Sequence, residues 1–459
     1  MTMSDDLTAA MAAIVGPEHV TAADSIGEDY THDECLTVPA AHPDVVARPD
    51  QSAQVAQILV HCDRAQIPVT ARGSGTGLSG AATPQAGGVL VSFERMAQVL
   101  EIDVDNHAAV VQPGVTLQQL DEQLAPHRLV YPVFPGEYSA SLGGNVNTNA
   151  GGMRAVKYGV TRNNVLGLEA VLPSGEIIRS GGKMVKSSSG YDLTQLILGS
   201  EGTLALVTEA TLKLHPRLAH AATVLAPFAA LTQVTEAVPR IVDSGIAPMI
   251  LEYIDIMTMS AMTTSYDLQL GIPDEIRESA LAYLVVMLEN ADADRLDADI
   301  ESLGTHLAEL GAVDVYVLPP QAAHNIIDAR EKAFYLAKAN GAQDIVDVVV
   351  PRAAIPDFMA KVEALAAETS SWIVGCGHAG DGNVHLGVFQ NNPDQLEVVM
   401  KGLFRAAQEL GGAISGEHGL GRAKRRFYLE LEDPAKIDLM RRIKAAFDPN
   451  GILNPGAMI

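Results

Sequence analysis

The sequence predicts an α+β fold in two parts. Up to about residue 215, short apolar runs of strand length alternate with a few helical patterns and many glycines. From about residue 220 to residue 375 the glycines are sparse, and longer helical patterns separate the strands. The 459 residues are too many for one ordinary domain, and their apolar content of 47% is enough to build a large core.

The first part is expected to open with a short helix and a loop over 1–40. Ser52 begins a helical pattern in which the apolar residues share one face. Thr116 is an expected N-cap for a helix that ends near residue 124. Pro173-Ser174-Gly175 separates two apolar runs and indicates a hairpin over 163–179. Strands are expected at 44–48, 67–72, 88–92, 108–112 and 204–214.

The second part combines helices and strands in the same way. Its helical patterns lie at 230–243, 274–282, 295–310 and 320–339, and its strand patterns lie at 283–288, 313–318 and 345–350. The C-terminal residues return to a glycine-rich segment, which is followed by a helix expected over 435–447.

The charge balance excludes several classes of partner. Lys+Arg is 31 and Asp+Glu is 56, which gives a net charge of −25. Such a surface repels phosphate backbones and anionic lipid headgroups, so we expect no nucleic acid and no membrane surface as partners. Three scattered cysteines are typical of a reducing compartment. No signal peptide is recognisable, and the apolar runs are shorter than the roughly 20 residues that cross a bilayer. We therefore expect a cytoplasmic protein without a transmembrane segment.

Many of the 40 glycines lie in five clusters, at 73–88, 143–152, 175–202, 375–387 and 411–421. Because glycine permits sharp turns and close approach of the backbone, the clusters indicate one large ligand that is contacted from several sides.

The first cluster contains a G-x-G-x-x-G pattern at Gly75, Gly77 and Gly80, after an expected strand. A dinucleotide-binding Rossmann turn would require a helix to begin there. Pro84 and the Gly87-Gly88 pair follow instead, and they are incompatible with the interior of a helix. The pattern therefore favours a loop whose backbone N–H groups hold a diphosphate. A long flexible turn is the alternative on this segment alone.

The second cluster combines small residues with Asn145, Asn147 and Asn149. Small residues let a backbone approach a flat ring system, and amide side chains supply donors and acceptors for its edge. An Asx-rich loop without a ligand is the alternative on this segment alone.

Three segments together resemble the FAD domain of the vanillyl-alcohol oxidase (p-cresol methylhydroxylase, PCMH) superfamily. They are RGSGTGLSGA at 72–81, GGNVNTNAGG at 143–152 and GYDLTQLILGSEGTL at 190–204. The resemblance is strongest to the D-lactate, glycolate and D-2-hydroxyglutarate dehydrogenases. It implies a bipartite FAD-binding domain over 1–216, a cap domain for the substrate over 217–410, and a segment over 411–459 that packs back on the FAD domain.

The resemblance also implies FAD as the cofactor and the residues that hold it. The pyrophosphate would lie on Arg72, Gly73, Ser74, Gly75, Thr76, Gly77, Leu78 and Ser79. The isoalloxazine and its linker would lie against Pro135, Gly136, Ser141, Leu142, Gly144, Asn145, Thr148, Asn149 and Gly151. Gly202 and Val207 would lie near the adenine, and Asn454 would return to the flavin.

Four polar residues of the last two clusters predict a metal site. His378 and His385 flank a D-G-N turn, which can bring both imidazoles toward one point, and Glu417 and His418 lie in a second glycine-rich turn. Two histidines and one carboxylate with open positions are typical of a catalytic site. The resemblance agrees, since it implies His378, His385 and Glu417 as ligands of zinc or manganese and His418 as the base. Asn383 would hold the substrate or an oxygen on the metal.

The implied reaction is the oxidation of a D-2-hydroxy acid to the 2-oxo acid. A divalent metal would lower the pKa of the substrate hydroxyl, His418 would take its proton, and a hydride would pass to FAD. Arg330, on a helical pattern, matches the arginine that binds the substrate carboxylate in this family; a solvated, paired helix charge is the alternative. Relatives specific for D-2-hydroxyglutarate carry a lysine at the position of Ile345, so D-lactate or glycolate is favoured as the substrate.

Three other hypotheses stay open. The first is a D-2-hydroxyglutarate dehydrogenase. The second is an FAD-binding electron-transfer subunit without its own hydroxy-acid activity. The third is a metallohydrolase, which leaves the first two glycine clusters unexplained. The expected partners are a small 2-hydroxy acid and an electron acceptor, either a quinone, an electron-transfer flavoprotein, a cytochrome or oxygen, and a homodimer is left open.

Overall fold

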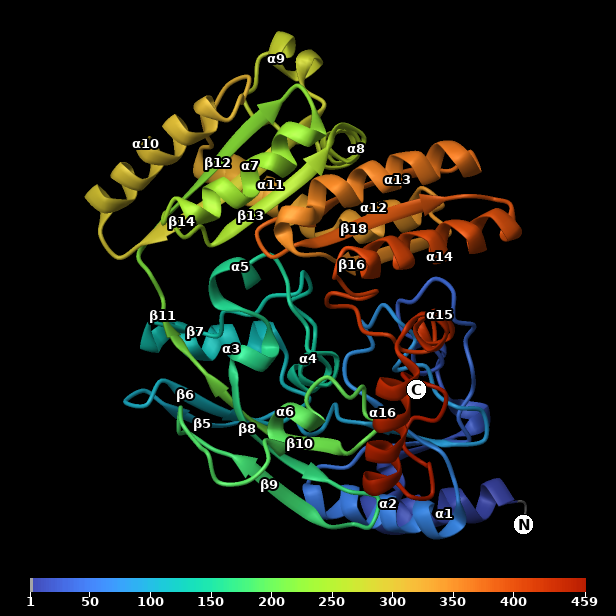
Figure 1. The fold of residues 1–459 in the computed structure, drawn as a ribbon. Helices are drawn as coiled ribbons and strands as arrows, with labels where there is room; N and C mark the ends of the chain where they lie inside the picture. Colours follow the sequence, from blue (N-terminus) through green and yellow to red (C-terminus); the bar gives the residue numbers. More distant parts are fainter. Residues whose placement is uncertain (1–2) are drawn as a thin grey trace. The chain divides into compact units, whose positions relative to one another are not determined.

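The computed structural model describes residues 3–459, which divide into two compact units (Figure 1). Unit 1 comprises the residues up to Ala150 together with Val160–Arg217 and Glu417–Ile459. Unit 2 comprises Gly151–Gly159 and Leu218–Gly416. Among residues 3–459, no helix combines the length and the apolar character that are needed to cross a membrane.

Unit 1 contains a small mixed sheet with the strand order β1-β2-β4-β3. The strands are β1 (Val20–Ala22), β2 (Val45–Ala47), β3 (Val69–Arg72) and β4 (Val89–Ser92). Helices α1 (Met3–Val15) and α2 (Ser52–Ala65) contribute to the same core, since Met11 and Leu59 are fully buried with Val69 and Val91. The sheet therefore anchors β3, and the first glycine-rich loop begins at its carboxyl end.

The second sheet of unit 1 has the order β5-β6-β10-β8-β9 and is antiparallel. Its strands are β5 (Val99–Asp103), β6 (Ala108–Val111), β8 (Val165–Val171), β9 (Ile177–Gly181) and β10 (Leu206–Lys213), and β7 (Leu129–Val130) pairs separately with β11 (His215–Pro216). The helices of this part are α3 (Leu117–Leu124), α4 (Leu142–Thr148) and α6 (Leu193–Ile197), and the C-terminal segment adds α15 (Arg425–Leu431) and α16 (Pro434–Phe447). The expected hairpin and the Thr116 cap are confirmed: β8 pairs with β9, and the Thr116 hydroxyl accepts the backbone N–H of Gln119.

Unit 2 is built on one seven-stranded sheet with the order β15-β12-β14-β13-β17-β18-β16. The strands are β12 (His220–Phe228), β13 (Ile250–Asp255), β14 (Ala282–Asn290), β15 (Tyr316–Val317), β16 (Asp344–Val349), β17 (Trp372–His378) and β18 (Asn383–Phe389). The helices are α5 (Ala155–Tyr158), α7 (Leu231–Asp243), α8 (Ile256–Tyr266), α9 (Asp274–Ser279), α10 (Ala293–Glu309), α11 (Pro320–Glu331), α12 (Ala333–Ala339), α13 (Ile355–Thr369) and α14 (Pro393–Glu409).

Helices cover both faces of this sheet. On one face, Ile254 and Cys376 are buried together with Met259 of α8 and Ile326 of α11. On the other face, the hydroxyl of Tyr253 lies 3.9 Å from the sulfur of Met359 on α13. Because side chains alternate along a strand, Glu252 lies on the same face as Ile254, under α8 and α11.

The structure differs from the expected elements at several places. The helix expected over 320–339 is two helices, α11 and α12, which meet at Lys332. The strand expected over 313–318 is reduced to Tyr316–Val317. A helix, α4, occupies part of the second glycine cluster, where the composition alone did not predict one. Helices α8, α13 and α14 and strands β12, β13, β17 and β18 were not predicted.

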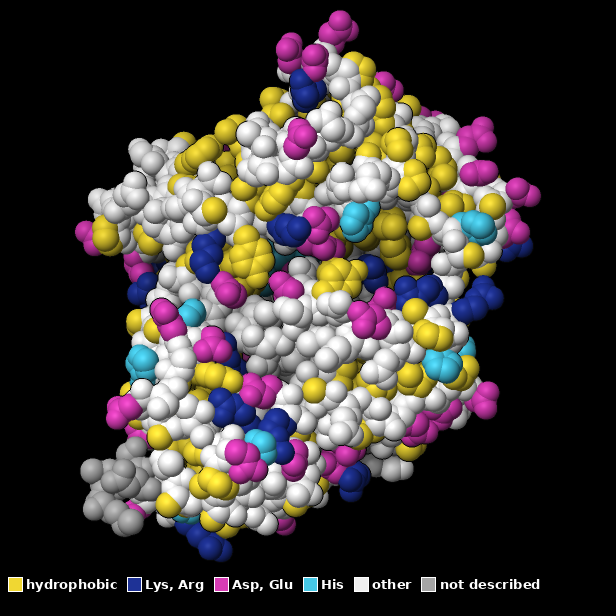
Figure 2. Space-filling view, turned by 180° about the vertical axis from the view of Figure 1, so that it is seen from behind, with side chains coloured by type: hydrophobic (Ala, Val, Ile, Leu, Met, Phe, Trp, Pro, Cys, Tyr) yellow, Lys and Arg dark blue, Asp and Glu magenta, His cyan; other side chains and the backbone are white. Residues whose placement is uncertain are grey.

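Residues 151–159 were expected in the first domain, whereas the structure places them in unit 2. Their position follows from apolar packing, because Met153 forms a small core cluster with Met249 and Ile250 of unit 2. The C-terminal residues Glu417–Ile459 belong to unit 1. On the face shown in Figure 2, acidic side chains are scattered, with Lys and Arg between them.

Candidate cofactor pocket and histidine cluster

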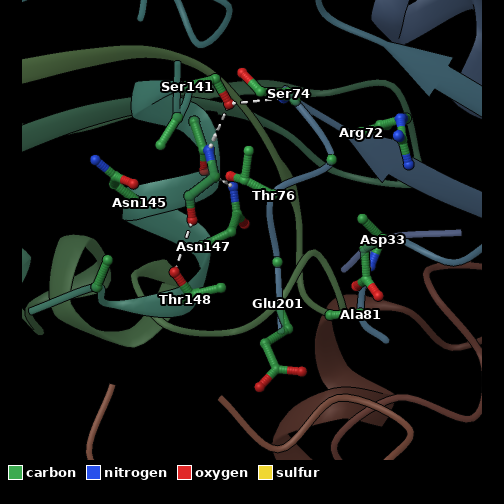
Figure 3. Close-up of a pocket in the computed structure, with 18 of the residues that line it drawn as sticks. Asp33, Arg72, Ser74, Thr76, Ala81, Ser141, Asn145, Asn147, Thr148 and Glu201 are labelled. Atoms are coloured by element: carbon green, nitrogen blue, oxygen red, sulfur yellow. Dashed lines mark hydrogen bonds between the residues drawn. The ribbon is translucent and has the colours of Figure 1, made fainter. Parts of the chain in front are cut away.

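Unit 1 contains a pocket that is lined largely by the glycine-rich segments (Figure 3). It encloses about 1120 Å³ of space, including the part that is open to solvent. The lining consists of Asp33, residues 71–79, Ala81, Ala82, Phe93, Pro113, Pro135, Glu137, Ala140, Ser141, Gly143, Gly144, Asn145, Asn147, Thr148, Ala150, Glu201, Gly202, Val207, Glu417 and His418.

The loop after β3 forms one wall of this pocket. It contains no helix, so the interpretation of the G-x-G-x-x-G pattern as a non-Rossmann loop is confirmed. Gly75 has a φ of +77°, and a Cβ there would lie 2.0 Å from Nη2 of Arg72. Arg72 is buried and donates to the carbonyls of Asp29 and His32. Burial lowers the pKa of Arg72, but the guanidinium keeps its charge because its ordinary pKa is so high.

The first turn of α4 forms a second, adjoining wall. The Ser141 hydroxyl accepts the backbone N–H of Gly144 and also that of Ser74, each at 3.3 Å, and so joins the two glycine clusters. A Cβ on Gly143 would lie 2.5 Å from the Cβ of Pro113, which explains a glycine inside this helix. Figure 3 shows these polar side chains around the pocket.

Three buried polar atoms in the lining of the pocket indicate that it suits a large polar ligand. Ser79 Oγ, Asn145 Nδ2 and Asn147 Oδ1 have no hydrogen-bond partner among the described residues. Leaving a buried polar group unsatisfied costs about 1–3 kcal/mol, so such atoms are normally satisfied by a ligand or water. The donors, the acceptor and the small-residue walls fit a dinucleotide with a flat ring.

The C-terminal segment of unit 1 completes the pocket with Glu417 and His418. Glu201 holds this segment, since its carboxylate accepts the backbone N–H groups of Leu420 and Gly421. Burial raises the pKa of Glu201 to about 7. Burial also raises the pKa of Asp33, a second carboxyl group in the lining.

In unit 2, His378 and His385 lie on the paired strands β17 and β18. Their ring centroids are 4.8 Å apart, so the predicted convergence of the two imidazoles is observed. His378 donates its Nδ1–H to Glu252 at 2.6 Å, so Nε2 is the nitrogen that would bind a metal. Asp347 lies directly opposite His385 on the neighbouring strand.

Arg330 and Asn383 are also in unit 2, and both are buried with acidic partners. Arg330 lies 2.7 Å from Oε2 of Glu252 and is 7% exposed. Asn383 donates from Nδ2 to Asp347 and to the carbonyl of Val348, each at 2.8 Å. Both amide hydrogens of Asn383 are therefore used to hold strand β16.

The cofactor residues expected from the resemblance fall into two groups. All of Arg72–Ser79 line the pocket, together with Pro135, Ser141, Gly144, Asn145, Thr148, Gly202 and Val207. Gly136, Leu142, Asn149, Gly151 and Asn454 are outside the lining. Leu142 is in the apolar core, and the Asn454 side chain donates to the carbonyls of Ala81 and Glu201, beside two loops of the pocket.

Sequence reasoning missed four acidic residues: Asp33, Glu201, Glu252 and Asp347. Glu252 and Asp347 had a visible signal, because each is a carboxylate within an otherwise apolar strand-like run. Glu201 lies within the GSEGTL segment, but its partners are more than 200 positions away.

Comparison with known proteins supports a dinucleotide as the ligand of the pocket. Residues 43–181 match the profile of the FAD binding domain, and residues 217–458 match that of the C-terminal domain of FAD linked oxidases. The fold and the pocket thus define an FAD-linked oxidoreductase. More specifically, the chain belongs to the FAD-linked oxidase family that contains D-lactate dehydrogenases, glycolate oxidase subunits and D-2-hydroxyglutarate dehydrogenases.

Several relatives cover nearly the whole chain. An uncharacterized FAD-linked oxidoreductase of Mycobacterium tuberculosis is 60% identical over 453 residues, which is 99% of each chain. The D-lactate dehydrogenase of Anaerostipes hadrus is 37% identical and covers 96% of this chain and 95% of its own. The glycolate oxidase subunit GlcD of Bacillus subtilis is 36% identical, with 99% and 97% covered.

Solved structures share the fold. p-Cresol methylhydroxylase superposes with a TM-score of 0.80 at 18% identity, covering 100% of this chain and 97% of its own. Alkyldihydroxyacetonephosphate synthase has a TM-score of 0.75 at 18% identity, with 98% and 85% covered. The chain therefore has the PCMH-type FAD-binding fold, as the resemblance implied.

Proposed function

We propose that this protein oxidises a D-2-hydroxy acid, with D-lactate or glycolate favoured, to the 2-oxo acid. The observation that carries the proposal is the position of His418 in the lining of the cofactor pocket. A general base must lie within reach of both the cofactor and the substrate, and His titrates near neutral pH. Bound FAD supplies the redox chemistry by accepting a hydride from the carbinol carbon.

His418 takes the proton of the substrate hydroxyl in this proposal, so that one proton and one hydride leave the hydroxy acid together. His378, His385 and Glu417 would hold a divalent metal, zinc or manganese. Such a metal, when bound, lowers the pKa of the hydroxyl that binds it. The residue types suit this metal, because two imidazoles and one carboxylate leave coordination positions open for a substrate.

Arg330 would bind the substrate carboxylate. A guanidinium carries five N–H donors in a fork, so it can bind Glu252 and a second carboxylate together. The apolar side chain of Ile345 favours a substrate with a single carboxylate. It lies opposite Gly387 on β18, on the same strand face as Asp347 and His385, and it has no charge to offer to a second carboxylate.

The test is anaerobic reduction of the bound flavin, followed at about 450 nm, with D-lactate, glycolate, D-2-hydroxyglutarate and L-lactate. We expect bleaching by D-lactate or glycolate and none by L-lactate. If only D-2-hydroxyglutarate bleached the flavin, the substrate would be D-2-hydroxyglutarate and not D-lactate or glycolate. A flavin that no hydroxy acid reduces would favour an electron-transfer subunit, a role consistent with the word "subunit" in the name of the GlcD relatives.

A further inference from the structure

Glu252 is a fully buried carboxylate within an apolar strand of unit 2. It is 0% exposed, and its neighbours Leu251 and Tyr253 are equally buried. Burying an ionised carboxylate is strongly unfavourable unless it is paired and hydrogen-bonded. Glu252 is therefore kept in the core only by the groups that contact it.

Each carboxylate oxygen of Glu252 contacts a residue to which the proposed function gives a role, either metal binding or substrate binding. Oε1 accepts the Nδ1–H of His378 at 2.6 Å, and Oε2 pairs with Nη2 of Arg330 at 2.7 Å. His378 comes from the end of β17 and Arg330 from the last turn of α11. One carboxylate thus joins the proposed metal-binding histidine to the proposed substrate-binding arginine.

We propose that Glu252 is a positioning residue that sets the tautomer of His378 and the orientation of Arg330 at once. The inference rests on the proposed function, because it assumes that His378 binds the metal and Arg330 the substrate. A carboxylate only accepts hydrogen bonds, so Nδ1 of His378 must carry a proton and Nε2 must face the metal. Carboxylate–histidine pairs of this kind orient metal ligands and raise their basicity.

Glutamine cannot replace Glu252, although it has the same shape. Both partners are donors, and the amide of glutamine offers one acceptor and one donor group. Whichever way the amide turns, its NH₂ group faces either the imidazole N–H or the guanidinium. The substitution therefore either removes one of the two contacts or moves the proton of His378 from Nδ1 to Nε2, and in neither case does it open a cavity.

The experiment compares the wild type with E252Q, E252D and D255N, all with FAD bound and stripped of metal. Asp255 is the matched control, since it is the second carboxyl group of β13 and is partly buried, but its oxygens accept the backbone N–H groups of Thr258 and Gly375 and contact neither His378 nor Arg330. Zinc affinity is measured by competition with a chromophoric chelator, without turnover. The expected result is zinc binding about 10–100-fold weaker in E252Q, intermediate in E252D and unchanged in D255N.

Steady-state turnover tests the contact between Glu252 and Arg330 separately from zinc binding. With zinc at saturating concentration, E252Q is expected to show a raised KM for the hydroxy acid, because a neutral amide lacks the charge that pairs with the guanidinium of Arg330. Unchanged zinc affinity in E252Q, or an equal loss in D255N, would overturn the positioning role while leaving flavin reduction by the wild type intact. If E252Q does not fold, wild-type zinc affinity in E252D would overturn it instead. A wild type that binds zinc but oxidises no hydroxy acid would refute the proposed reaction and not the link between Glu252 and His378.

Discussion

Oε2 of Glu201 accepts the backbone N–H of Gly421 at 2.7 Å, across 220 positions of the chain. Oε1 accepts the neighbouring N–H of Leu420 at 2.6 Å. These two bonds hold the segment that follows His418, so a buried carboxylate supports the position of the proposed base. Asn454 holds the carbonyl of Glu201 in turn, at 2.8 Å.

The first prediction concerns the pH dependence of stability. Burial raises the pKa of Glu201 from 4.5 to about 7, so the folded protein binds this proton more tightly than the unfolded chain. Glu201 therefore stabilises the fold most below its unfolded pKa, and this stability is lost as the pH rises through about 7. We compare the free energy of unfolding of the wild type with that of E201Q. The difference, wild type minus E201Q, should fall by about 1.4 kcal/mol per pH unit between the unfolded pKa of 4.5 and the folded pKa of about 7.

Denaturant unfolding of both proteins at about pH 5, 6, 7 and 8 measures this difference. E201Q also lacks one hydrogen-bond acceptor. This loss lowers its free energy of unfolding by the same amount at every pH, so it does not change the pH dependence of the difference. A difference that does not change with pH would contradict the raised pKa.

The second prediction concerns the wall of the pocket at α4. In Gly143→Ala the new Cβ would lie 2.5 Å from Pro113, so α4 must shift away from the loop that contains Pro113. We expect loss of bound FAD, measured as the ratio of absorbance at about 450 nm to protein. Gly304→Ala is the control: it lies in α10, a Cβ there meets no described atom within 4 Å, and it should add about 0.5–1 kcal/mol of stability. Full FAD content in G143A would argue against this wall as a cofactor contact.

The third prediction concerns His418. In His418→Ala we expect flavin reduction by the hydroxy acid to slow by at least about 10²–10⁴-fold, because the proton acceptor is lost. The FAD content should stay at the wild-type level. Anaerobic stopped-flow absorbance measures both quantities, and His127→Ala, an exposed histidine outside the pocket lining, is the control. An unchanged rate would remove His418 from the mechanism.

The fourth prediction concerns metal removal. Exhaustive chelation should abolish flavin reduction by D-lactate and leave FAD bound, since Glu417 is the one proposed metal ligand that also lines the cofactor pocket. Added zinc or manganese should restore the rate. A full rate in protein whose metal content has been measured as negligible would show that the reaction needs no metal.

The fifth prediction concerns Arg330. Lysine keeps the charge but lacks the planar fork that binds two carboxylates side by side. In Arg330→Lys we expect weaker substrate binding by about 1.5–3 kcal/mol, seen as a higher concentration of hydroxy acid for half-maximal flavin reduction. Lys332→Arg is a suitable control because Lys332 pairs with Asp328 on the same helix and is half-exposed. Equal effects of both substitutions would indicate a general perturbation of α11.

Local patterns in the sequence were sufficient for much of the fold. The Thr116 cap, the turn at Pro173-Ser174-Gly175 and the exclusion of a Rossmann helix after Gly80 each depend on neighbouring residues, so they could be predicted. Ordered motifs also carried the resemblance to the FAD-linked oxidases. Buried strands such as β17 and β18 were missed, because their glycines and histidines obscure the apolar alternation that marks a strand.

By itself, the sequence determined the family, the α+β class, FAD as the cofactor and the residue types of the proposed metal and base site. Only the tertiary structure decided which carboxylates support that site. Glu201 contacts Gly421 and Glu252 contacts His378, pairs that are 220 and 126 positions apart. Likewise, Asn383 is committed to Asp347 on another strand. Such contacts form between segments that strand pairing brings together, and a buried carboxylate shows its role only once its partners are known.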